Sequence, residues 1–361
     1  MRTYLDHNAS SPLRPAAKAA MLAALELTGN GSSVHAEGRI AHALIDGARQ
    51  AIARQLGVIA PMVVFTGGGS EANNLALKGS NAERLIVSAI EHPSVIEAAK
   101  AADKDVELIP VDSNGVVDLD ALRFMLPGPK ALVSLMLANN ETGVIQPVRQ
   151  AAAIAHEHGA LVHTDAVQGF GKVPVNFGLL GVDLMSVSAH KLGGPMGVGA
   201  LVIRDGLPMR SLIHGGGQEQ RRRAGTENLA GIAGFAAAAN EQLNDIKILR
   251  DRLEARLEEA MIFGRGAERL ANTTCFAMAG MNAETLLMGF DIDGIAVSSG
   301  SACSSGKVAR SHVLGAMGFA PDISGAAIRV SLGWTTTPDD IDQFIAVWKR
   351  LLARHRARKA A

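Results

Sequence analysis

Apolar and polar positions follow two alternating rhythms along the first two thirds of the chain. Short apolar runs rich in Val, Ile and Leu predict buried β-strands, and longer segments with apolar positions three or four apart predict helices. The predicted helices span residues 14–27, 37–57, 70–79, 91–102 and 147–159. The predicted strands span residues 62–66, 84–90, 106–112, 131–138, 160–166, 183–190 and 199–204. Because apolar strands alternate with helices, we expect an α/β fold whose mostly parallel central sheet is covered by helices on both faces.

The last third of the chain has a different pattern. The pattern of apolar positions predicts one long helix over residues 227–263, which leaves the parallel sheet. It predicts strands over residues 272–278 and 327–334. At 361 residues the chain exceeds the roughly 250–300 residues that one hydrophobic core usually holds. We therefore expect two domains. The large domain is expected to span residues 14–245, and a smaller α+β domain to combine residues 1–13 with 246–361.

Composition excludes several classes of protein. The formal net charge is zero, so no extended basic surface for nucleic acid is expected. The two cysteines cannot build a disulfide framework, which favours a reducing compartment. The N-terminus lacks the apolar core of a signal peptide, and no apolar run approaches the ~18 residues of a membrane span. We expect a cytoplasmic protein without nucleic-acid or membrane partners.

Polar side chains follow several of the predicted strands at the point where each strand ends. They are the segment GGGSE at 67–71, Glu91 and His92, Asn139 to Glu141, Asp165 and Gln168, and Ser188, His190 and Lys191. The carboxyl ends of parallel strands meet at one edge of a sheet, where α/β proteins bind their ligands. We therefore expect these groups to form one site.

Some of these groups match the chemistry of pyridoxal phosphate. The glycines before the helix at 70–79 suit a phosphate at a helix N-terminus, although they also fit a plain tight turn. Lys191 suits an amine that attacks carbonyls, although an ordinary surface lysine fits as well. Asp165 could keep a pyridine nitrogen protonated, and His92 could stack on the ring or be a structural histidine. The set predicts this cofactor more strongly than any single member, and no metal site is expected.

The two cysteines lie in contrasting surroundings. Cys275 lies in the apolar segment NTTCFAM, which predicts a buried strand. Cys303 lies in SSGSACSSG, where serine and glycine predict a flexible loop. A thiol on a mobile loop suits a group that reacts in one place and delivers its product in another.

Motifs spread over nearly the whole chain resemble those of the cysteine desulfurases of the NifS/IscS type. They are YLDHNASSP, GNGSSVHAEGR, VVFTGGGSEANNLALKG, EHPSV, NNETGVIQPV, HTDAVQGFGK, SAHKLGGPMGVGAL, GGGQEQRRRAGTEN and SSGSAC. Those enzymes have the class V aminotransferase fold, a fold-type I architecture that binds pyridoxal 5′-phosphate. The resemblance implies the same activity here, in which sulfur is removed from L-cysteine to give L-alanine and a persulfide on Cys303.

The resemblance also implies a role for each matching residue at the cofactor. Lys191 would bind the cofactor covalently, and Asp165 would pair with the pyridine nitrogen. Gln168 would contact the ring hydroxyl, and His92 would stack on the ring. The phosphate would be held by Gly69, Ser70, Ser188 and His190, and by Thr226 reaching across from the neighbouring subunit. A homodimer is therefore implied.

For the substrate, the resemblance implies that Asn140 and Arg329 hold the carboxylate of L-cysteine. Lys191 or another nearby base would move the α-proton, and His92 is a candidate for taking the proton of the Cys303 thiol. The persulfide would pass to a sulfur-acceptor protein such as an iron–sulfur scaffold. Iron–sulfur clusters, nitrogenase, thiolated tRNA and thiamine all stay open as destinations of the sulfur.

Two alternatives remain. Another class V enzyme, an aminotransferase or a selenocysteine lyase, would use the same cofactor without needing Cys303. A non-catalytic sulfur-relay or assembly protein could keep the fold, although retention of Lys191, Asp165 and His92 argues against it.

Overall fold

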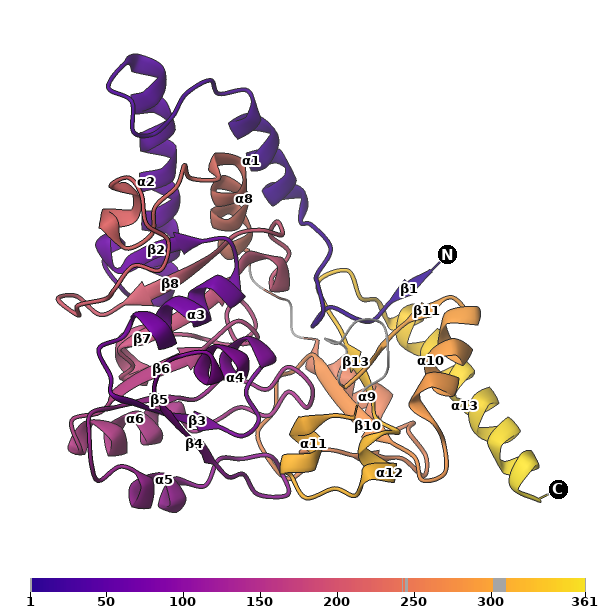
Figure 1. The fold of residues 1–361 in the computed structure, drawn as a ribbon. Coiled ribbons are helices and arrows are strands. Elements are labelled where there is room, and N and C mark those ends of the chain that lie inside the picture. The colour runs from indigo at the N-terminus through magenta and orange to yellow at the C-terminus, as the bar shows by residue number, and fades with distance from the viewer. Residues whose placement is uncertain (1, 242, 244–245, 301–309, 361) are drawn as a thin grey trace.

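The computed structural model describes the chain apart from residues 1, 242, 244–245, 301–309 and 361 (Figure 1). Within the described part, the larger sheet has the strand order β2-β8-β7-β6-β5-β3-β4. Its strands are β2 (Val63–Thr66), β3 (Arg84–Ser88), β4 (Asp105–Ile109), β5 (Ala131–Ser134), β6 (Leu161–Asp165), β7 (Leu184–Ser188) and β8 (Gly199–Ile203). Strands β4, β3, β5, β6 and β7 pair in parallel, and β8 is antiparallel to both β7 and β2. The expected mostly parallel sheet is confirmed.

Helices cover both faces of this sheet because alternate strand residues point in opposite directions. Ile86, Val133 and Val162 belong to one core, and their neighbours Leu85 and Leu132 belong to the core on the other face. The first face is covered by α1 (Pro15–Leu25), α2 (Ala36–Leu56), α5 (Leu119–Met125), α6 (Val148–Glu157), α7 (Phe177–Leu180) and α8 (Leu229–Ala239). The second face is covered by α3 (Gly69–Gly79) and α4 (Pro93–Lys100).

The C-terminal part of the chain forms a second sheet and a second core. Its antiparallel strands are β12 (Ser298–Ser299), β13 (Ile328–Ser331), β10 (Thr273–Ala277) and β9 (Met261–Ile262), in that order. Its helices are α9 (Lys247–Glu254), α10 (Ala283–Ile292), α11 (His312–Ala316), α12 (Pro321–Ser324) and α13 (Pro338–Ala360). Phe276, Phe344 and Trp348 are fully buried in this core, where Phe276 meets the other two rings edge-on.

The N-terminal segment connects the two parts of the molecule. Strand β1 (Thr3–Tyr4) pairs in parallel with β11 (Ile295–Ala296) of the C-terminal part. The chain then crosses to α1, which packs against α8 beside the larger sheet (Figure 1). This crossing brings residues 6–12 past the edge of the larger sheet. The exact division at residues 13/14 and 245/246 stays a prediction.

The expectation of one helix over residues 227–263 is wrong. Helix α8 ends at Ala239, α9 spans Lys247–Glu254, and Met261–Ile262 form a strand. The physical reason is burial, because Phe235 of α8 lies in the first core of the larger sheet and Leu253 of α9 lies in the C-terminal core. The chain also turns at Glu259, whose φ of 60° cannot continue a helix. No helix in the described part of the chain is long and apolar enough to cross a membrane.

Candidate active site

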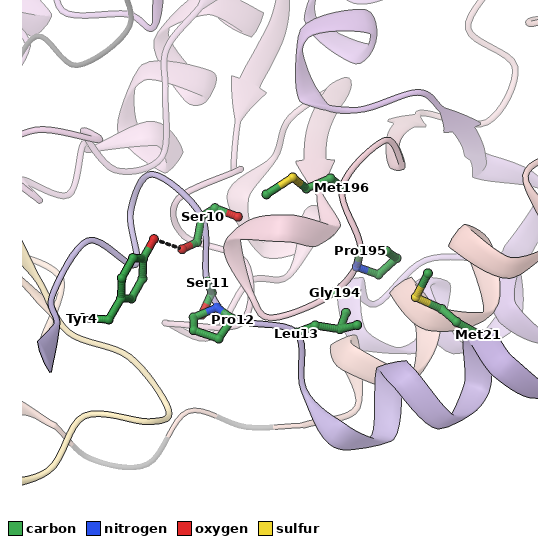
Figure 2. Close-up of a pocket in the computed structure, with 9 residues that line it drawn as sticks. All are labelled: Tyr4, Ser10, Ser11, Pro12, Leu13, Met21, Gly194, Pro195 and Met196. Carbon is green, nitrogen blue, oxygen red and sulfur yellow. Dashed lines mark hydrogen bonds between the residues drawn. The ribbon is translucent and has the colours of Figure 1, made fainter. Parts of the chain in front are cut away.

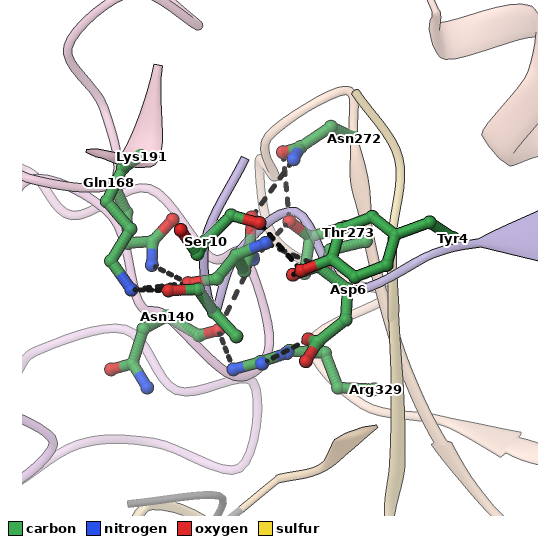
Figure 3. Close-up of polar contacts among 12 residues, drawn as sticks. Tyr4, Asp6, Ser10, Asn140, Gln168, Lys191, Asn272, Thr273 and Arg329 are labelled. Carbon is green, nitrogen blue, oxygen red and sulfur yellow. Dashed lines mark hydrogen bonds and ion pairs between the residues drawn. The ribbon is translucent and has the colours of Figure 1, made fainter. Parts of the chain in front are cut away.

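Lys191 lies at the carboxyl edge of the larger sheet. Strand β7 ends at Ser188, and the short helical turn η2 (Ala189–Lys191) carries the lysine past it. The Nζ of Lys191 donates hydrogen bonds to the carbonyl oxygens of Asn8 at 2.6 Å and Ala9 at 2.9 Å. Gln168 reaches the same Asn8 carbonyl at 3.0 Å, so both predicted residues point toward the N-terminal segment (Figure 3).

Asp165 ends strand β6 and is almost fully buried. Its Oδ1 accepts a hydrogen bond from the backbone N–H of Val167 at 2.9 Å, and its Oδ2 accepts one from Asn73 of α3 at 2.8 Å. These donors fix the carboxylate on both sides. Sequence reasoning missed Asn73, although a polar residue on the sheet-facing side of helix α3 was a usable signal.

His92 is the N-cap of helix α4 and connects to Asp165 through the same asparagine. Its Nδ1 accepts a hydrogen bond from the backbone N–H of Ser94 at 3.1 Å and lies 2.8 Å from the Ser94 hydroxyl. Asn73 donates to that hydroxyl at 2.9 Å, so the hydroxyl hydrogen is directed at Nδ1. The neutral imidazole therefore carries its proton on Nε2.

The charges around His92 favour this neutral form. Burial lowers its pKa; the charge of Asp165 acts in the opposite sense, and that of Lys191 lowers the pKa further. Burial, together with repulsion from Asp165, raises the pKa of Glu91 well above its ordinary value, which disfavours a second negative charge near Asp165. The Oε1 of Glu91 accepts the backbone N–H of Met136 at 2.5 Å.

The predicted phosphate residues gather where helix α3 begins. Gly69 lies close to Ser188, since a Cβ added to Gly69 would come within 3.5 Å of the Ser188 Cβ and 2.9 Å of a Val167 methyl. Gly68 has a φ of 147°, and a Cβ there would meet open space. Ser70 follows in the first turn of the helix. The helix N-terminus thus offers backbone N–H groups beside an open volume, which suits a phosphate.

His190 and Thr226 complete the predicted phosphate set. Burial lowers the pKa of His190 to about 4, with Lys191 and Lys172 adding to the effect, so this imidazole is neutral. Thr226 lines a small hollow together with Gly67. The assignment of Thr226 to the neighbouring subunit's phosphate stays a prediction.

Arg329, from strand β13, faces the same edge from the C-terminal part of the molecule (Figure 3). Its Nη2 donates to Asp6 at 2.7 Å, and its Nη1 donates to the backbone carbonyl of Asn140 at 3.1 Å. Its Nε is buried and has no acceptor among the described residues. The guanidinium is thus held in place with one buried donor left for a ligand. Sequence reasoning did not assign a role to Asp6.

The two cysteines differ as far as the structure describes them. Cys275 is a buried residue of β10, and burial raises the pKa of its thiol, as expected for an inert core residue. Cys303 lies outside the described residues. Among those residues, no group of His, Cys, Asp or Glu is arranged to hold a metal ion.

A separate pocket of about 490 Å³ borders the N-terminal segment and the turn at 194–196 (Figure 2). It is lined by Tyr4, Ser10, Ser11, Pro12, Leu13, Met21, Gly194, Pro195 and Met196. None of the predicted site residues lines this pocket. The candidate site is therefore the sheet edge and not this hollow.

A family model described as Aminotransferase class-V matches residues 3–344 of the chain. The chain belongs to the aminotransferase class-V family. Enzymes of this family generally depend on pyridoxal phosphate. One relative, cysteine desulfurase IscS of Dictyoglomus turgidum, is 40% identical over 98% of this chain and 95% of its own length.

Solved structures of similar proteins have the same fold. A NifS-like protein from Rickettsia africae matches with a TM-score of 0.92 at 36% identity, covering 98% of this chain and 100% of that chain. A structure described as SspA in complex with cysteine matches with a TM-score of 0.83 at 30% identity, covering 93% and 100%. The resemblance to NifS/IscS-type proteins and the expected fold are confirmed.

Proposed function

We propose that this chain is a cysteine desulfurase that uses pyridoxal 5′-phosphate to convert L-cysteine into L-alanine and a persulfide on Cys303. The observation that carries the proposal is the convergence of Lys191, Asp165 and His92 on one sheet edge. Relatives named cysteine desulfurase, and the cysteine complex of SspA, support the choice of substrate.

The residues at this edge fit the cofactor. The N-terminus of α3, with Gly69 and Ser70, would hold the phosphate together with Ser188 and His190. Asp165 would face the pyridine nitrogen, and its fixed carboxylate keeps a positive charge there favourable. When bound, the cofactor would act as an electron sink for negative charge that develops on the substrate.

Lys191 and His92 have different tasks in this proposal. Lys191 would bind the cofactor through Nζ and, once released, move the proton at the substrate α-carbon. The carbonyls of Asn8 and Ala9 give its amine a defined place. His92 would stack on the ring with its proton on Nε2, because its Nδ1 is occupied by Ser94. His92 in this form donates a hydrogen bond and has no lone pair at Nε2 to take a proton from a thiol.

Arg329 would bind the substrate carboxylate with its unpaired Nε, and Asn140 would flank it. The thiolate of Cys303 would then form a bond to the substrate sulfur while the carbon–sulfur bond breaks. The electron pair of that bond goes to the β-carbon, which takes up a proton and becomes the methyl group of alanine. The sulfur stays on Cys303 as a persulfide.

The proposal includes partners. A second copy of the chain would supply Thr226 to the phosphate, and a sulfur acceptor such as an iron–sulfur scaffold protein would take the persulfide sulfur. The formation of the persulfide and the transfer of its sulfur would both take place in the cytoplasm.

The test compares the parent protein with Lys191→Ala after loading with pyridoxal phosphate. The parent is expected to form alanine from L-cysteine, and Lys191→Ala to form none while it keeps the fold by circular dichroism. Alanine formation at the parent rate in Lys191→Ala contradicts the proposal. Amino-acid turnover that persists in Cys303→Ala would instead indicate an aminotransferase or a lyase.

A further inference from the structure

Asn8 is a buried residue whose side chain is bonded on every side. Its Oδ1 accepts hydrogen bonds from the Nζ of Lys172 at 2.8 Å and from the amide of Asn272 at 3.0 Å. Its Nδ2 donates to the hydroxyl of Thr273 at 2.9 Å and to the carbonyl of Asn140 at 3.3 Å. These partners lie on segments that follow strands of the larger sheet and on the C-terminal part, so the amide is fixed between them.

The main chain of the same residue faces the cofactor lysine. The Asn8 carbonyl accepts from Lys191 at 2.6 Å and from Gln168 at 3.0 Å, and the Ala9 carbonyl accepts from Lys191 at 2.9 Å. Asn8 therefore joins two sets of contacts. Its side chain determines where the peptide lies, and the peptide determines where the amine of Lys191 is received.

We propose that Asn8 is a positioning residue for Lys191, because its anchored side chain fixes the pair of carbonyls that hold the lysine amine. Carbonyl acceptors bond more strongly to an ammonium than to a neutral amine, since the ammonium bond is charge-assisted. The pair therefore favours the protonated form of Lys191 and gives the amine a defined position after it leaves the cofactor.

Several ionisable groups face the Lys191 amine. Lys172 and His190 lie on the segments that follow β6 and β7, and His92 lies on the cap of α4. The charge of Arg329, on β13, acts on Lys172 and His92. Burial, together with the charges of Lys191 and Arg329, lowers the pKa of Lys172 well below its ordinary value. The Asp165 carboxylate, at the end of β6, acts on His92, and Asp6, on the N-terminal segment, pairs with Arg329.

These basic groups are buried close together, so a proton on one of them disfavours a proton on the others. Within that competition, the main-chain carbonyls of Asn8 and Ala9 favour a proton on Lys191. Two opposite outcomes can therefore be told apart when Asn8 is replaced. Loss of the hydrogen bonds from Lys191 to the two carbonyls lowers the pKa of Lys191. A general loosening of the site that admits water raises this pKa instead, because hydration favours the charged amine.

The inference rests on the proposed function for its meaning, since Lys191 is the proposed cofactor residue. The test of the inference is independent of the proposed function, because the test uses the full chain without cofactor. The Lys191 amine is acetylated by trace acetic anhydride over a range of pH values, and peptide mass spectrometry gives the apparent pKa. Asn8→Leu is expected to lower the Lys191 pKa by about one unit, the size expected for a lost charge-assisted hydrogen bond.

Lys104 is an internal control in the same peptide map. Its Nζ donates to the carbonyls of Leu77 and Ser80, far along the chain from Asn8, and its pKa should not change. Thr273→Val is the milder variant, because it removes a single hydroxyl, which accepts from Asn8 and donates to Asn272. We expect a smaller shift of Lys191 in the same direction.

An unchanged or raised Lys191 pKa in a folded Asn8→Leu protein overturns the proposal. If Asn8→Leu does not fold, Thr273→Val decides in the same way. A shift of Lys104 equal to that of Lys191 also contradicts it, because the change would then be global. Absence of alanine formation in the loaded parent would count against the proposed function alone.

Discussion

Glu141 is a carboxyl group buried beside the substrate-side residues. It is 2% exposed, and its Oε2 accepts the hydroxyl hydrogen of Ser311 at 2.5 Å. Burial raises its pKa from 4.5 to about 7, although Ser311 and Arg329 act in the opposite direction. In the folded protein this group therefore keeps a proton that the unfolded chain releases at a lower pH.

The sign of the effect follows from the raised pKa. As pH rises from 4.5 to about 7, the unfolded state loses this proton first, so the free energy of unfolding falls. The loss amounts to roughly 3 kcal/mol at neutral pH and above. The side chain of Gln in Glu141→Gln does not ionise. The thermal-unfolding midpoint of this variant is therefore expected to rise relative to that of the parent as the buffer changes from mildly acidic to mildly alkaline.

The measurement is the difference between the thermal-unfolding midpoints of parent and variant at both ends of that range. Glu97→Gln is the control, since Glu97 is an exposed residue of α4. A difference between parent and Glu141→Gln that does not change with pH would show that Glu141 is ionised in the folded protein.

Asn73 is the residue that connects Asp165 with His92. In Asn73→Leu, the Asp165 carboxylate and the Ser94 hydroxyl lose their shared donor. A hydrogen bond to a charged group contributes about 1.5–3 kcal/mol, so pyridoxal phosphate should bind on the order of tenfold more weakly. Equilibrium titration followed by cofactor absorbance measures this change.

Asn74→Leu is the matched control in the same helix. The side chain of Asn74 bonds only to the Ser70 carbonyl of its own helix, at 2.9 Å, among the contacts described. Cofactor affinity should stay close to that of the parent. Equal weakening in the two variants would mean that loss of helix α3, and not loss of the Asp165 contact, is responsible.

The sequence pointed to some site residues and not to others for a physical reason. Lys191, Asp165 and His92 directly follow apolar strands, so the strand pattern alone placed them at one edge. Asn73 and Asn8 act through hydrogen bonds to residues distant in sequence, and a single sequence does not contain those distances. Their positions became informative only with the contacts.

At the scale of secondary structure, the apolar runs predicted where strands occur but did not predict where each strand ends. The apolar run 131–138 predicts one strand, yet β5 ends at Ser134. Residues 135–138 stay buried, and the backbone N–H groups of Leu135 and Leu137 still donate to the carbonyls of His163 and Asp165 before the turn at Asn139. Apolar runs therefore report burial, and burial continues where the chain bends to deliver polar groups to the site.

The segment η3 (Gln218–Arg221) is held in a left-handed conformation by one buried carboxylate. Glu219 has a φ of 47° and accepts two hydrogen bonds from Arg49 of α2, at 2.7 and 2.8 Å. It also accepts the backbone N–H of Phe65 at 2.8 Å. These contacts fix the segment that leads to Thr226.

Glu219→Ala is expected to lower the free energy of unfolding by about 3–5 kcal/mol, because it leaves the Arg49 charge buried without its partner. Urea unfolding measures the change. Glu97→Ala breaks an exposed ion pair with Lys100 and should cost less than about 1 kcal/mol. A loss of similar size in both variants would contradict the structural role of Glu219.

At the scale of the whole molecule, the N-terminal segment joins two sheets and passes the site between them. Strand β1 pairs with β11 of the C-terminal part. The sequence predicted that residues 1–13 belong to the C-terminal domain, and this division stays a prediction. It did not predict that Asn8 and Ala9 would contact Lys191 on the way. Chain crossings of this kind depend on how two sheets pack, which local patterns do not encode.

Sulfur transfer requires the whole molecule, since Lys191 and Arg329 come from different sheets and Cys303 lies outside the described residues. The most direct test of the account maps sulfur on the protein after reaction with L-cysteine. The loaded parent is incubated with L-cysteine, and its peptides are analysed by mass spectrometry while alanine is quantified. We predict one added sulfur on the Cys303 peptide, none on the Cys275 peptide, and alanine in step with the persulfide. A persulfide on Cys275, or alanine formed by Cys303→Ser at the parent rate, would contradict the account.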